Sequence, residues 1–412
     1  MKRLKKYKFS ELYEMSSGIS SKPEQAGHGA PFCSFTTVFN NYFLPPELPD
    51  QMDTSVEEQE TYSLKKGDVL LTRTSETLDE LGMSSVATKD YPEATFSGFL
   101  KRLRPTQTDV VYHKFLAFYL RSPLFRKAMN NNAVMTLRCS LNEQIFSYLD
   151  LLLPDFNQQK KIGDLLFQIY AKIELNHRIN EELEGMAKLL YDYWFVQFDF
   201  PMTAAQAAAL GNPKLKGKPY RASGGKMIPN EALKRKIPEG WDVLRVGDVL
   251  AKELRTKNIL SSQIVDRGRI PVVDQGSTFI CGFTDDEDST INETPKIVFG
   301  DHTRILKFIN FPFARGADGT QILTSRENRL PQHLFFYQLL SFDLSSYGYA
   351  RHFKFLKDQK VVLPDEAAAN AFEQIVGSLY TKIKNNIFQN QQLTQLRDWL
   401  LPMLMNGQVT VS

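Results

Sequence analysis

Two stretches of the chain place apolar residues at alternating steps of three and four, which is the spacing of a helix with one apolar seam. The first seam begins at Ile162 and ends at Trp194, and the second begins at Phe372 and ends at Leu404. Such a seam often lies on the core of its own domain, and that interpretation would account for either helix alone. Because the two seams match in length and spacing, they favour two helices that pair with each other.

Asparagines interrupt both seams at corresponding places, Asn176 and Asn180 in the first and Asn386 and Asn390 in the second. An asparagine that faced leucine or isoleucine would lose its hydrogen-bond partners, so we expect the asparagines to face each other. An antiparallel pairing joins Asn176 to Asn390 and Asn180 to Asn386. A parallel pairing also aligns asparagines, so the seam alone does not choose. We expect the antiparallel form, which gives the two halves of the chain a pseudo-twofold axis.

The seams are part of a longer internal repeat. The motif Leu153-Pro154-Asp155 returns as Leu363-Pro364-Asp365, an offset of 210 positions from 153 to 363, and Tyr170 returns as Tyr380 at the same offset. Self-similarity over such a distance indicates a duplicated structural unit. Each copy is predicted to be a mixed domain that is followed by a long helix.

The mixed domains contain short apolar runs that are bounded by turn residues, such as 69–71 after a Lys-Gly-Asp turn and 296–299 before a Gly-Asp turn. Such runs predict strands of a small sheet, and the stretches 112–129 and 331–342 predict helices. The fold class expected is α+β, with two similar mixed α/β domains separated by two long helices that pair as an antiparallel coiled coil. The predicted segments are the domain 1–150, the helix 151–200, a linker 201–236, the domain 237–362 and the helix 363–412.

The overall composition is that of an ordinary globular protein, with 42% hydrophobic and 24% charged residues among 412 and a mean hydropathy of −0.32. No apolar run approaches the ~18 residues that a membrane helix needs. Tyr7 to Glu11 stand where a secretory signal would have its apolar core, so a cytoplasmic location is expected. The three cysteines are far apart and predict buried, reduced thiols.

The net charge of +3 is too small to argue for a nucleic-acid partner, but its distribution is uneven. The segment 201–236 has eight basic residues and one acidic residue among glycines and prolines. Its composition indicates a solvated linker. The alternative is a segment that rests on phosphate or on an acidic partner.

The sequence lacks the motifs of the common catalytic sites. It has no Walker loop, no dinucleotide fingerprint, no Gly-x-Ser-x-Gly elbow and no Asn-Pro-Pro-Tyr-like methyltransferase motif. The six histidines show no metal-ligand spacing, and the paired carboxylates resemble solvated faces. We therefore expect neither catalytic residues nor a metal site in this chain.

A run of motifs around the middle of the chain resembles the DNA specificity subunit of type I restriction-modification systems. These motifs are Phe198-Asp199-Phe200-Pro201, Gly217-Lys218-Pro219-Tyr220-Arg221, Ser223-Gly224-Gly225-Lys226-Met227 and Ile237-Pro238-Glu239-Gly240-Trp241. The resemblance implies that 1–150 and 237–362 are target recognition domains, each reading one half of a bipartite target in double-stranded DNA. The second domain begins with a Pro-x-Gly-Trp motif at 238–241. The first domain lacks this motif and opens with Tyr7-Lys8-Phe9-Ser10-Glu11-Leu12.

The same resemblance implies the partners and cofactors. The paired helices would dock two modification subunits that carry S-adenosylmethionine and methylate adenine, and restriction subunits that use ATP and Mg would join the complex. No cofactor is expected on this chain itself. A protein scaffold that binds no DNA is the alternative, and a self-sufficient methyltransferase or nuclease is disfavoured by the missing motifs.

Candidate DNA contacts follow from the chemistry of base readout, in which Arg or Lys reads guanine and Asn or Gln reads adenine in the major groove. For each single residue a surface salt bridge or a phosphate contact is at least as good an interpretation. The candidates are Arg73, Thr74, Ser75, Arg102 and Arg138 in the first domain and Arg304, Arg315, Arg351 and Lys354 in the second.

Overall fold

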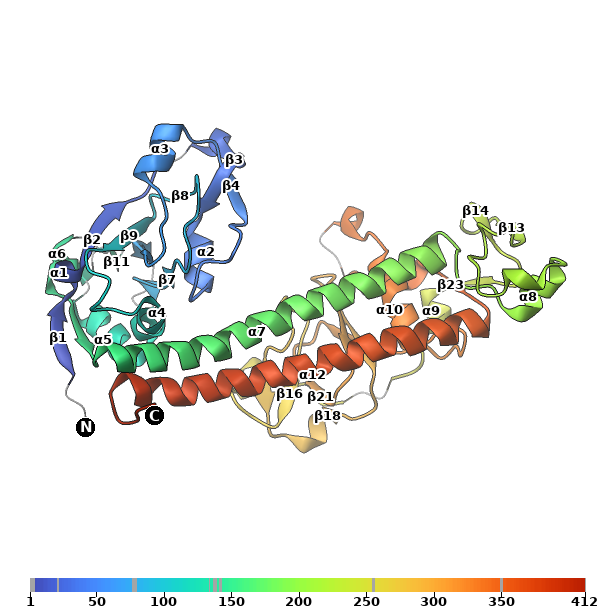
Figure 1. The fold of residues 1–412 in the computed structure, drawn as a ribbon. Coiled ribbons are helices and arrows are strands. Elements are labelled where there is room, and N and C mark those ends of the chain that lie inside the picture. Colours follow the sequence, from blue (N-terminus) through green and yellow to red (C-terminus); the bar gives the residue numbers. More distant parts are fainter. Residues whose placement is uncertain are drawn as a thin grey trace. The chain divides into compact units, whose positions relative to one another are not determined.

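The computed structural model describes residues 4–20, 22–75, 80–132, 134–135, 139–140, 143–253, 256–348 and 351–411. The chain forms two compact units, each with its own hydrophobic core. Unit 1 is Met1–Leu175 with Gln389–Ser412, and unit 2 is Asn176–Phe388. Both units mix helices and strands, which confirms the predicted α+β class (Figure 1). No helix in these described ranges is long and apolar enough to cross a membrane.

Unit 1 is built around a four-stranded antiparallel sheet in the order β2-β9-β5-β7, with three smaller sheets, β4-β3-β8, β1-β12 and β10-β11-β6. Its strands are β1 (Lys5–Lys8), β2 (Tyr13–Ser17), β3 (Ala26–Cys33), β4 (Asp50–Met52), β5 (Val69–Thr72), β6 (Thr74–Ser75), β7 (Ser84–Val86), β8 (Thr95–Phe96), β9 (Leu100–Pro105), β10 (Val134–Met135), β11 (Cys139–Ser140) and β12 (Asp150–Leu153). Its helices are α1 (Phe9–Leu12), η1 (Pro23–Gln25), α2 (Phe35–Asn40), α3 (Val56–Thr61), α4 (His113–Arg121), α5 (Pro123–Asn132) and α6 (Glu143–Tyr148), with the first part of α7 (Phe156–Tyr191) and the last part of α12 (Glu366–Met405).

Unit 2 carries a sheet β20-β19-β22 and a sheet β17-β16-β21-β18, with the pairs β13-β14 and β15-β23. Its strands are β13 (Met227–Asn230), β14 (Arg235–Pro238), β15 (Asp242–Arg245), β16 (Ile270–Val273), β17 (Gly282–Thr284), β18 (Thr290–Ile291), β19 (Lys296–Gly300), β20 (Leu306–Ile309), β21 (Phe313–Arg315), β22 (Thr320–Leu323) and β23 (Lys360–Leu363). Its helical elements, besides the rest of α7 and α12, are η3 (Asp192–Val196), α8 (Ala204–Ala209), η4 (Pro213–Leu215), α9 (Val246–Val249), η5 (Ser261–Gln263), η6 (Glu287–Ser289), α10 (Gln332–Leu340), η7 (Ser345–Tyr347) and α11 (Phe353–Asp358).

The apolar runs that the sequence marked as strands are the central strands of the sheets. All four residues of β5 and all five of β19 are buried. The predicted helix 331–342 is α10, whereas the predicted helix 112–129 is two helices. It breaks because Pro123 disfavours helical backbone at Ser122, which ends α4 in an extended conformation.

The internal repeat is confirmed by an identical strand register in the two units. Strand β1 pairs antiparallel with β12, so that Lys5 faces Leu153, and β15 pairs antiparallel with β23, so that Asp242 faces Leu363. Leu153 and Leu363 are the repeated residues that the sequence aligned. A one-turn helix follows the first strand of each pair, α1 after β1 in unit 1 and α9 after β15 in unit 2. The unusual start of the first domain is therefore the structural counterpart of 242–249.

The long helices lie antiparallel within each unit (Figure 1). In unit 2, Asn386 Nδ2 donates a hydrogen bond to Asn180 Oδ1 at 2.8 Å, and the rings of Trp194 and Phe372 are 6.2 Å apart. In unit 1, Ile162 near the start of α7 and Leu404 near the end of α12 belong to one core, and Asn390 Nδ2 donates to the backbone oxygen of Ile173 at 3.3 Å. These contacts confirm the antiparallel pairing. The predicted pair of Asn176 with Asn390 stays a prediction, because Asn176 belongs to unit 2 and Asn390 to unit 1.

A glycine lets α7 approach the domain that precedes it. A Cβ added to Gly163 would be 2.6 Å from the backbone nitrogen of Phe115, which lies in the buried helix α4. Real Cβ atoms essentially never come that close, so the backbones of α7 and α4 pack together only because this residue has no side chain. The long helix is therefore fixed to the core of unit 1.

The basic segment 201–236 is folded and is not an extended linker. Phe200, just before it, stacks on Tyr220 with ring centroids 4.7 Å apart and on Trp241 at 5.0 Å. These aromatic rings belong to the core of unit 2, whereas all eight basic side chains of the segment are exposed. Composition favoured a linker because glycine, proline and lysine dominate the segment. The stacked rings of Phe200, Tyr220 and Trp241 nevertheless attach the segment to the core of unit 2.

Candidate nucleic-acid interface

The central strand of each unit leads into a hairpin that carries candidate DNA contacts. In unit 1 the antiparallel strands β5 and β7 form a hairpin whose connection begins at Arg73, and in unit 2 the hairpin 301–305 joins β19 to β20. The two hairpins have equivalent surroundings. The backbone nitrogen of Arg73 donates to the oxygen of Phe99 at 2.8 Å, and that of Asp301 donates to the oxygen of Gly319 at 2.8 Å. Arg73 and Asp301 therefore occupy the same position in the two units.

In unit 1 this corner presents an exposed cation beside an exposed aromatic ring. Arg73 is exposed, and the side chain of Phe99 is 65% exposed in the turn between β8 and β9. The backbone of Thr74 and Ser75 forms β6, which pairs with β11 and brings Cys139 and Ser140 to the same hairpin. Arg138 lies outside the described residues. Sequence reasoning missed Phe99, although a lone phenylalanine after a Ser-Gly turn is a signal that could have been followed.

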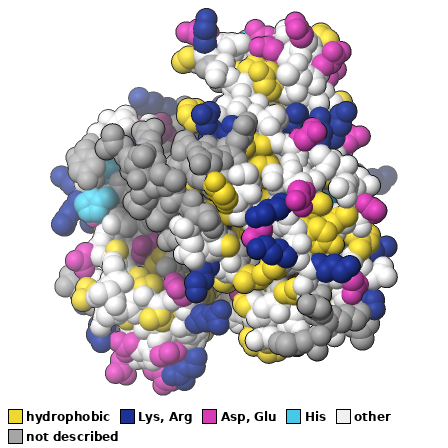
Figure 2. Space-filling model, turned by 90° about the vertical axis from the view of Figure 1, so that its left-hand side faces the viewer, with side chains coloured by type: hydrophobic (Ala, Val, Ile, Leu, Met, Phe, Trp, Pro, Cys, Tyr) yellow, Lys and Arg dark blue, Asp and Glu magenta, His cyan; other side chains and the backbone are white. Residues whose placement is uncertain are grey.

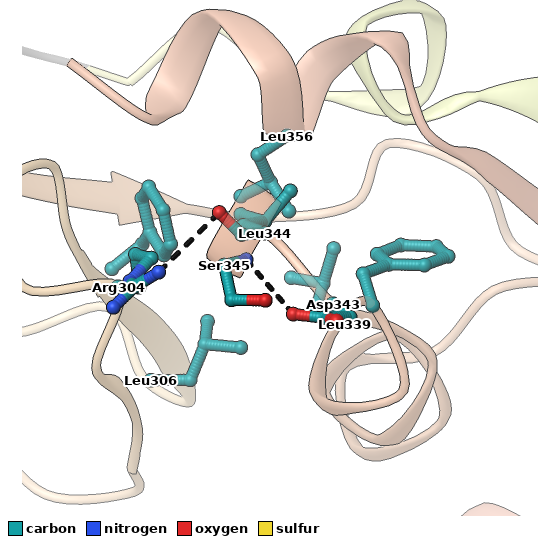
Figure 3. Close-up of a pocket in the computed structure, with 9 residues that line it drawn as sticks. Arg304, Leu306, Leu339, Asp343, Leu344, Ser345 and Leu356 are labelled. Carbon is teal, nitrogen blue, oxygen red and sulfur yellow. Dashed lines mark hydrogen bonds between the residues drawn. The ribbon is translucent and has the colours of Figure 1, made fainter. Parts of the chain in front are cut away.

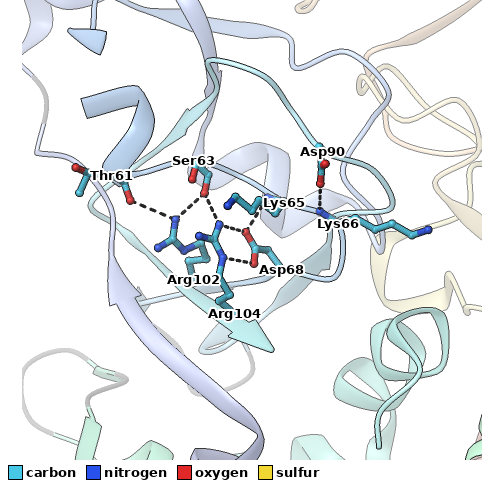
Figure 4. Close-up of polar contacts among 8 residues, drawn as sticks. All are labelled: Thr61, Ser63, Lys65, Lys66, Asp68, Asp90, Arg102 and Arg104. Atoms are coloured by element: carbon cyan, nitrogen blue, oxygen red, sulfur yellow. Dashed lines mark hydrogen bonds and ion pairs between the residues drawn. The ribbon is translucent and has the colours of Figure 1, made fainter. Parts of the chain in front are cut away.

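Arg102 does not lie at this corner as a free side chain. It belongs to β9, is 8% exposed, and its Nη1 donates to the backbone oxygen of Ser63 at 2.6 Å (Figure 4). Burial lowers the pKa of its guanidinium. Its neighbour Arg104 makes a bidentate pair with the buried Asp68, at 2.9 and 2.6 Å, which raises the pKa of Arg104. The prediction of a DNA contact at Arg102 is not supported by its position, because its guanidinium holds the loop before β5.

In unit 2 the buried carboxylate of Asp301 binds the start of α11 at the corresponding corner. Asp301 Oδ1 accepts the backbone N–H of Phe353 at 2.8 Å, and its backbone oxygen accepts the backbone N–H of His352 at 2.9 Å. These bonds hold the start of α11 against the hairpin 301–305. Arg304, Arg351 and Lys354 are all exposed there. The structure therefore brings together three of the four candidates of the second domain.

The fourth candidate, Arg315, has a different position. It lies half-buried in β21, its backbone oxygen accepts the N–H of Ile259 at 2.8 Å, and its Nη2 donates to the backbone oxygen of Thr256 at 3.1 Å. The guanidinium therefore holds the segment 256–259 along the sheet. A direct role in base readout is not supported by these contacts.

A pocket of about 190 Å³ lies beside Arg304 in unit 2 (Figure 3). Its lining is mainly apolar, and Arg304 Nη1 reaches the backbone oxygen of Leu344 at 3.4 Å. Asp343 also lines it, and hydrogen bonds from the hydroxyl and the backbone N–H of Ser345 hold the pKa of the Asp343 carboxyl below its usual range. The pocket has one ionised carboxylate and no histidine or cysteine, so it offers no acid–base pair.

Charge on the face shown in Figure 2 is mixed rather than gathered in one large basic patch. Figure 2 shows lysine and arginine side chains interspersed with acidic ones on the face that it presents. Among the described residues, no group of three His, Cys, Asp or Glu side chains could hold a metal ion. Short exposed groups such as Arg304, Arg351 and Lys354 are suited to local contacts with bases and phosphates.

Comparison with known proteins finds similarity to specificity subunits of type I restriction enzymes. The family model described as "Type I restriction modification DNA specificity domain" matches residues 1–185. The MjaIX specificity subunit of Methanocaldococcus jannaschii is 24% identical, covering 87% of this chain and 81% of that protein. The HindI specificity subunit of Haemophilus influenzae is 24% identical, covering 98% and 99%.

A solved structure supports the same fold. The S subunit of a type I restriction-modification system from M. genitalium superposes with a TM-score of 0.59 at 15% identity, covering 98% of this chain and 96% of that one. The sequence motifs, the duplicated units and the relatives agree with one another. Together they support a type I restriction-modification specificity subunit, with residues 1–185 corresponding to its DNA specificity domain.

Proposed function

We propose that this chain is the noncatalytic subunit that reads a bipartite target in double-stranded DNA for a type I restriction-modification complex. The observation that carries the proposal is the duplicated corner, in which each unit ends its central strand in a hairpin with exposed cations, Arg73 in unit 1 and Arg304 in unit 2. Guanidinium groups can contact guanine edges or phosphates. Each unit reads one half of the target.

The two half-sites differ in sequence, because the corners differ in chemistry at equivalent positions. Unit 1 has Arg73 and Phe99 where unit 2 has Asp301 and Gly319. The exposed cations of unit 2 come instead from Arg304 and from the start of α11. Two readers of unlike chemistry favour an asymmetric target rather than a palindrome.

The long helices dock two modification subunits. Met186 and Leu189 on α7 are 57% and 70% exposed, and Leu396 and Trp399 on α12 are 42% and 63% exposed. The second pair stands 210 positions after the first, which is the offset of the internal repeat. Members of each pair are three residues apart and share one helix face. An exposed apolar pair that the duplication repeats fits two copies of the same partner.

The chemistry of the complex resides on the partners. The modification subunits carry S-adenosylmethionine and methylate adenine, and the restriction subunits use ATP and Mg. This chain contributes the choice of sequence.

The test exchanges residues 1–150 for the corresponding part of another specificity subunit and maps methylated adenines in the genome of a strain that carries the partner genes. We expect one half of the recognised sequence to change and the other half to persist. A change in both halves would contradict separate readers. A methylome that does not depend on this chain at all would favour the protein-scaffold alternative.

A further inference from the structure

Phe99 is an aromatic side chain that unit 1 holds in solvent at a fixed place. Gly98 N donates to the oxygen of Ile19 at 2.7 Å, Phe99 N donates to Ser97 Oγ at 3.2 Å, and Leu100 N donates to the oxygen of Ser97 at 2.9 Å. Phe96, three residues earlier, is fully buried. The turn is therefore held by hydrogen bonds within unit 1, and the ring of Phe99 at its tip exposes apolar surface to water.

The neighbours of Phe99 indicate what covers the ring. Its backbone oxygen accepts the N–H of the exposed Arg73 at 2.8 Å, so the two residues are backbone neighbours at one corner. Thr74 and Ser75 continue the same hairpin. Protein interfaces are also enriched in arginine and aromatic residues, but a DNA reader has a specific use for this combination, since arginine contacts guanine and phenylalanine contacts the methyl group of thymine. The apolar group that the major groove offers is the C5-methyl of thymine.

We propose that Phe99 is a specificity-determining residue that reads a thymine of the half-site recognised by unit 1, through contact of its ring with the C5-methyl. This inference rests on the proposed function. Unit 2 has Gly319 at the equivalent position, so the other half-site has no corresponding contact. Phe99 thus gives the first half-site a requirement that the second lacks.

The test measures binding of the full complex with its modification subunits to a duplex that carries the site found in the methylome. Each thymine is replaced singly by deoxyuridine, which removes the methyl group and keeps the Watson–Crick pairing. With the wild-type chain, we expect deoxyuridine at one position of one half-site to lower the affinity for the duplex roughly fourfold, the value for one buried methyl group. With Phe99→Ala, the thymine duplex should bind about as weakly as the wild type binds the uracil duplex, and deoxyuridine at that position should cause no further loss.

Two variants keep the result interpretable. Phe99→Leu retains an apolar side chain and should retain most of the sensitivity to the methyl group. Val56→Ala alters another exposed apolar residue of unit 1, on α3. This variant should show the wild-type sensitivity to deoxyuridine at every thymine of the duplex. Because both parent side chains are exposed, all three variants should unfold at the wild-type temperature.

The outcomes that overturn the inference are distinct from failure of the proposed function. If Phe99→Ala weakens binding equally whether or not the methyl group is present, the ring acts as a wedge between base pairs or on the backbone. If Phe99→Ala keeps the full deoxyuridine sensitivity, or if neither half-site contains thymine, Phe99 reads no methyl group. If the wild-type complex shows no site-specific binding, the proposed function itself fails.

Discussion

The two units share one frame and differ at one corner. The strand pairs β1 with β12 and β15 with β23 have the same register, and a backbone hydrogen bond of 2.8 Å closes the same corner in both units. At that corner unit 1 has the exposed Arg73, whereas unit 2 has the buried Asp301. The comparison teaches that the backbone of a reader can be kept while its chemistry is replaced, because hydrogen bonds between main-chain atoms do not depend on the side chains.

The largest expected effect tests the shared frame. Phe372 in unit 2 and Ile162 in unit 1 occupy the same seam position at the repeat offset, and both are buried. Replacing Phe372 with Ala should lower the free energy of unfolding by about 3–5 kcal/mol, and Ile162→Ala by about 2–5 kcal/mol, through lost burial and a cavity. Denaturant unfolding of the full chain measures both. A neutral effect at either position would show that the seam is not a common structural element.

A smaller effect tests the difference at the corner. Asp301→Ala leaves the N–H of Phe353 without its carboxylate and should lower the free energy of unfolding by about 1–3 kcal/mol. Arg73→Ala, at the equivalent position of unit 1, should change it by less than about 0.5 kcal/mol because the side chain is exposed. Denaturant unfolding separates the two roles. Equal costs for the two variants would contradict the division between an anchor in unit 2 and a free side chain in unit 1.

The polar layer of unit 2 predicts an effect of about 1 kcal/mol. Asn180→Leu removes the acceptor of the 2.8 Å bond from Asn386, whose side chain is almost fully buried. Adding Asn386→Leu should restore stability, because two leucines in a seam form an apolar layer. Thermal unfolding of both single variants and the double variant gives the coupling energy. Additive losses would mean that the two asparagines do not act as a pair.

The smallest effect depends on pH and is confined to unit 1. Hydrogen bonds from Lys6 and Lys8, at 2.7 and 3.1 Å, hold the pKa of the Asp150 carboxyl below its usual range. Because the pKa is lowered in the folded state, this stabilisation is present above the unfolded pKa of about 3.9 and is lost as the pH falls through the folded value. Asp150→Asn should therefore cost at most about 0.5 kcal/mol at pH 7 and nothing near pH 2.

Unit 2 provides the control for that measurement. Lys360 stands at the repeat position of Asp150, and its Nζ donates to the backbone oxygen of Ala232. The change in the free energy of unfolding caused by Lys360→Met should be the same at pH 5 and at pH 2. A cost of Asp150→Asn that is the same at both ends of the pH range would rule out the lysine contacts as its cause.

The sequence predicted what depends on local periodicity. The seams and their asparagines predicted two paired helices because spacing along one helix fixes which residues share a face, but they did not choose between the parallel and antiparallel directions. Arg102 could not be assigned from sequence, because whether its side of β9 is buried depends on pairing with β2 and β5 far away in the chain. The folded state of 201–236 was missed for a similar reason, since Trp241 and Phe200 come from outside that segment. Phe99 becomes informative only once its hydrogen bond with Arg73 is known.

The register of β1 with β12 has a consequence for how such proteins diversify. Lys8 and Asp150 are paired neighbours, so everything between them is an insertion that leaves and rejoins the scaffold at adjacent points. Arg245 and Lys360 bracket the corresponding part of unit 2 in the same way. Recombination between genes at these short strands would exchange a whole reader while the new junctions meet an unchanged β-ladder. A lineage could thus acquire new targets by shuffling inserts, without having to evolve the helices again.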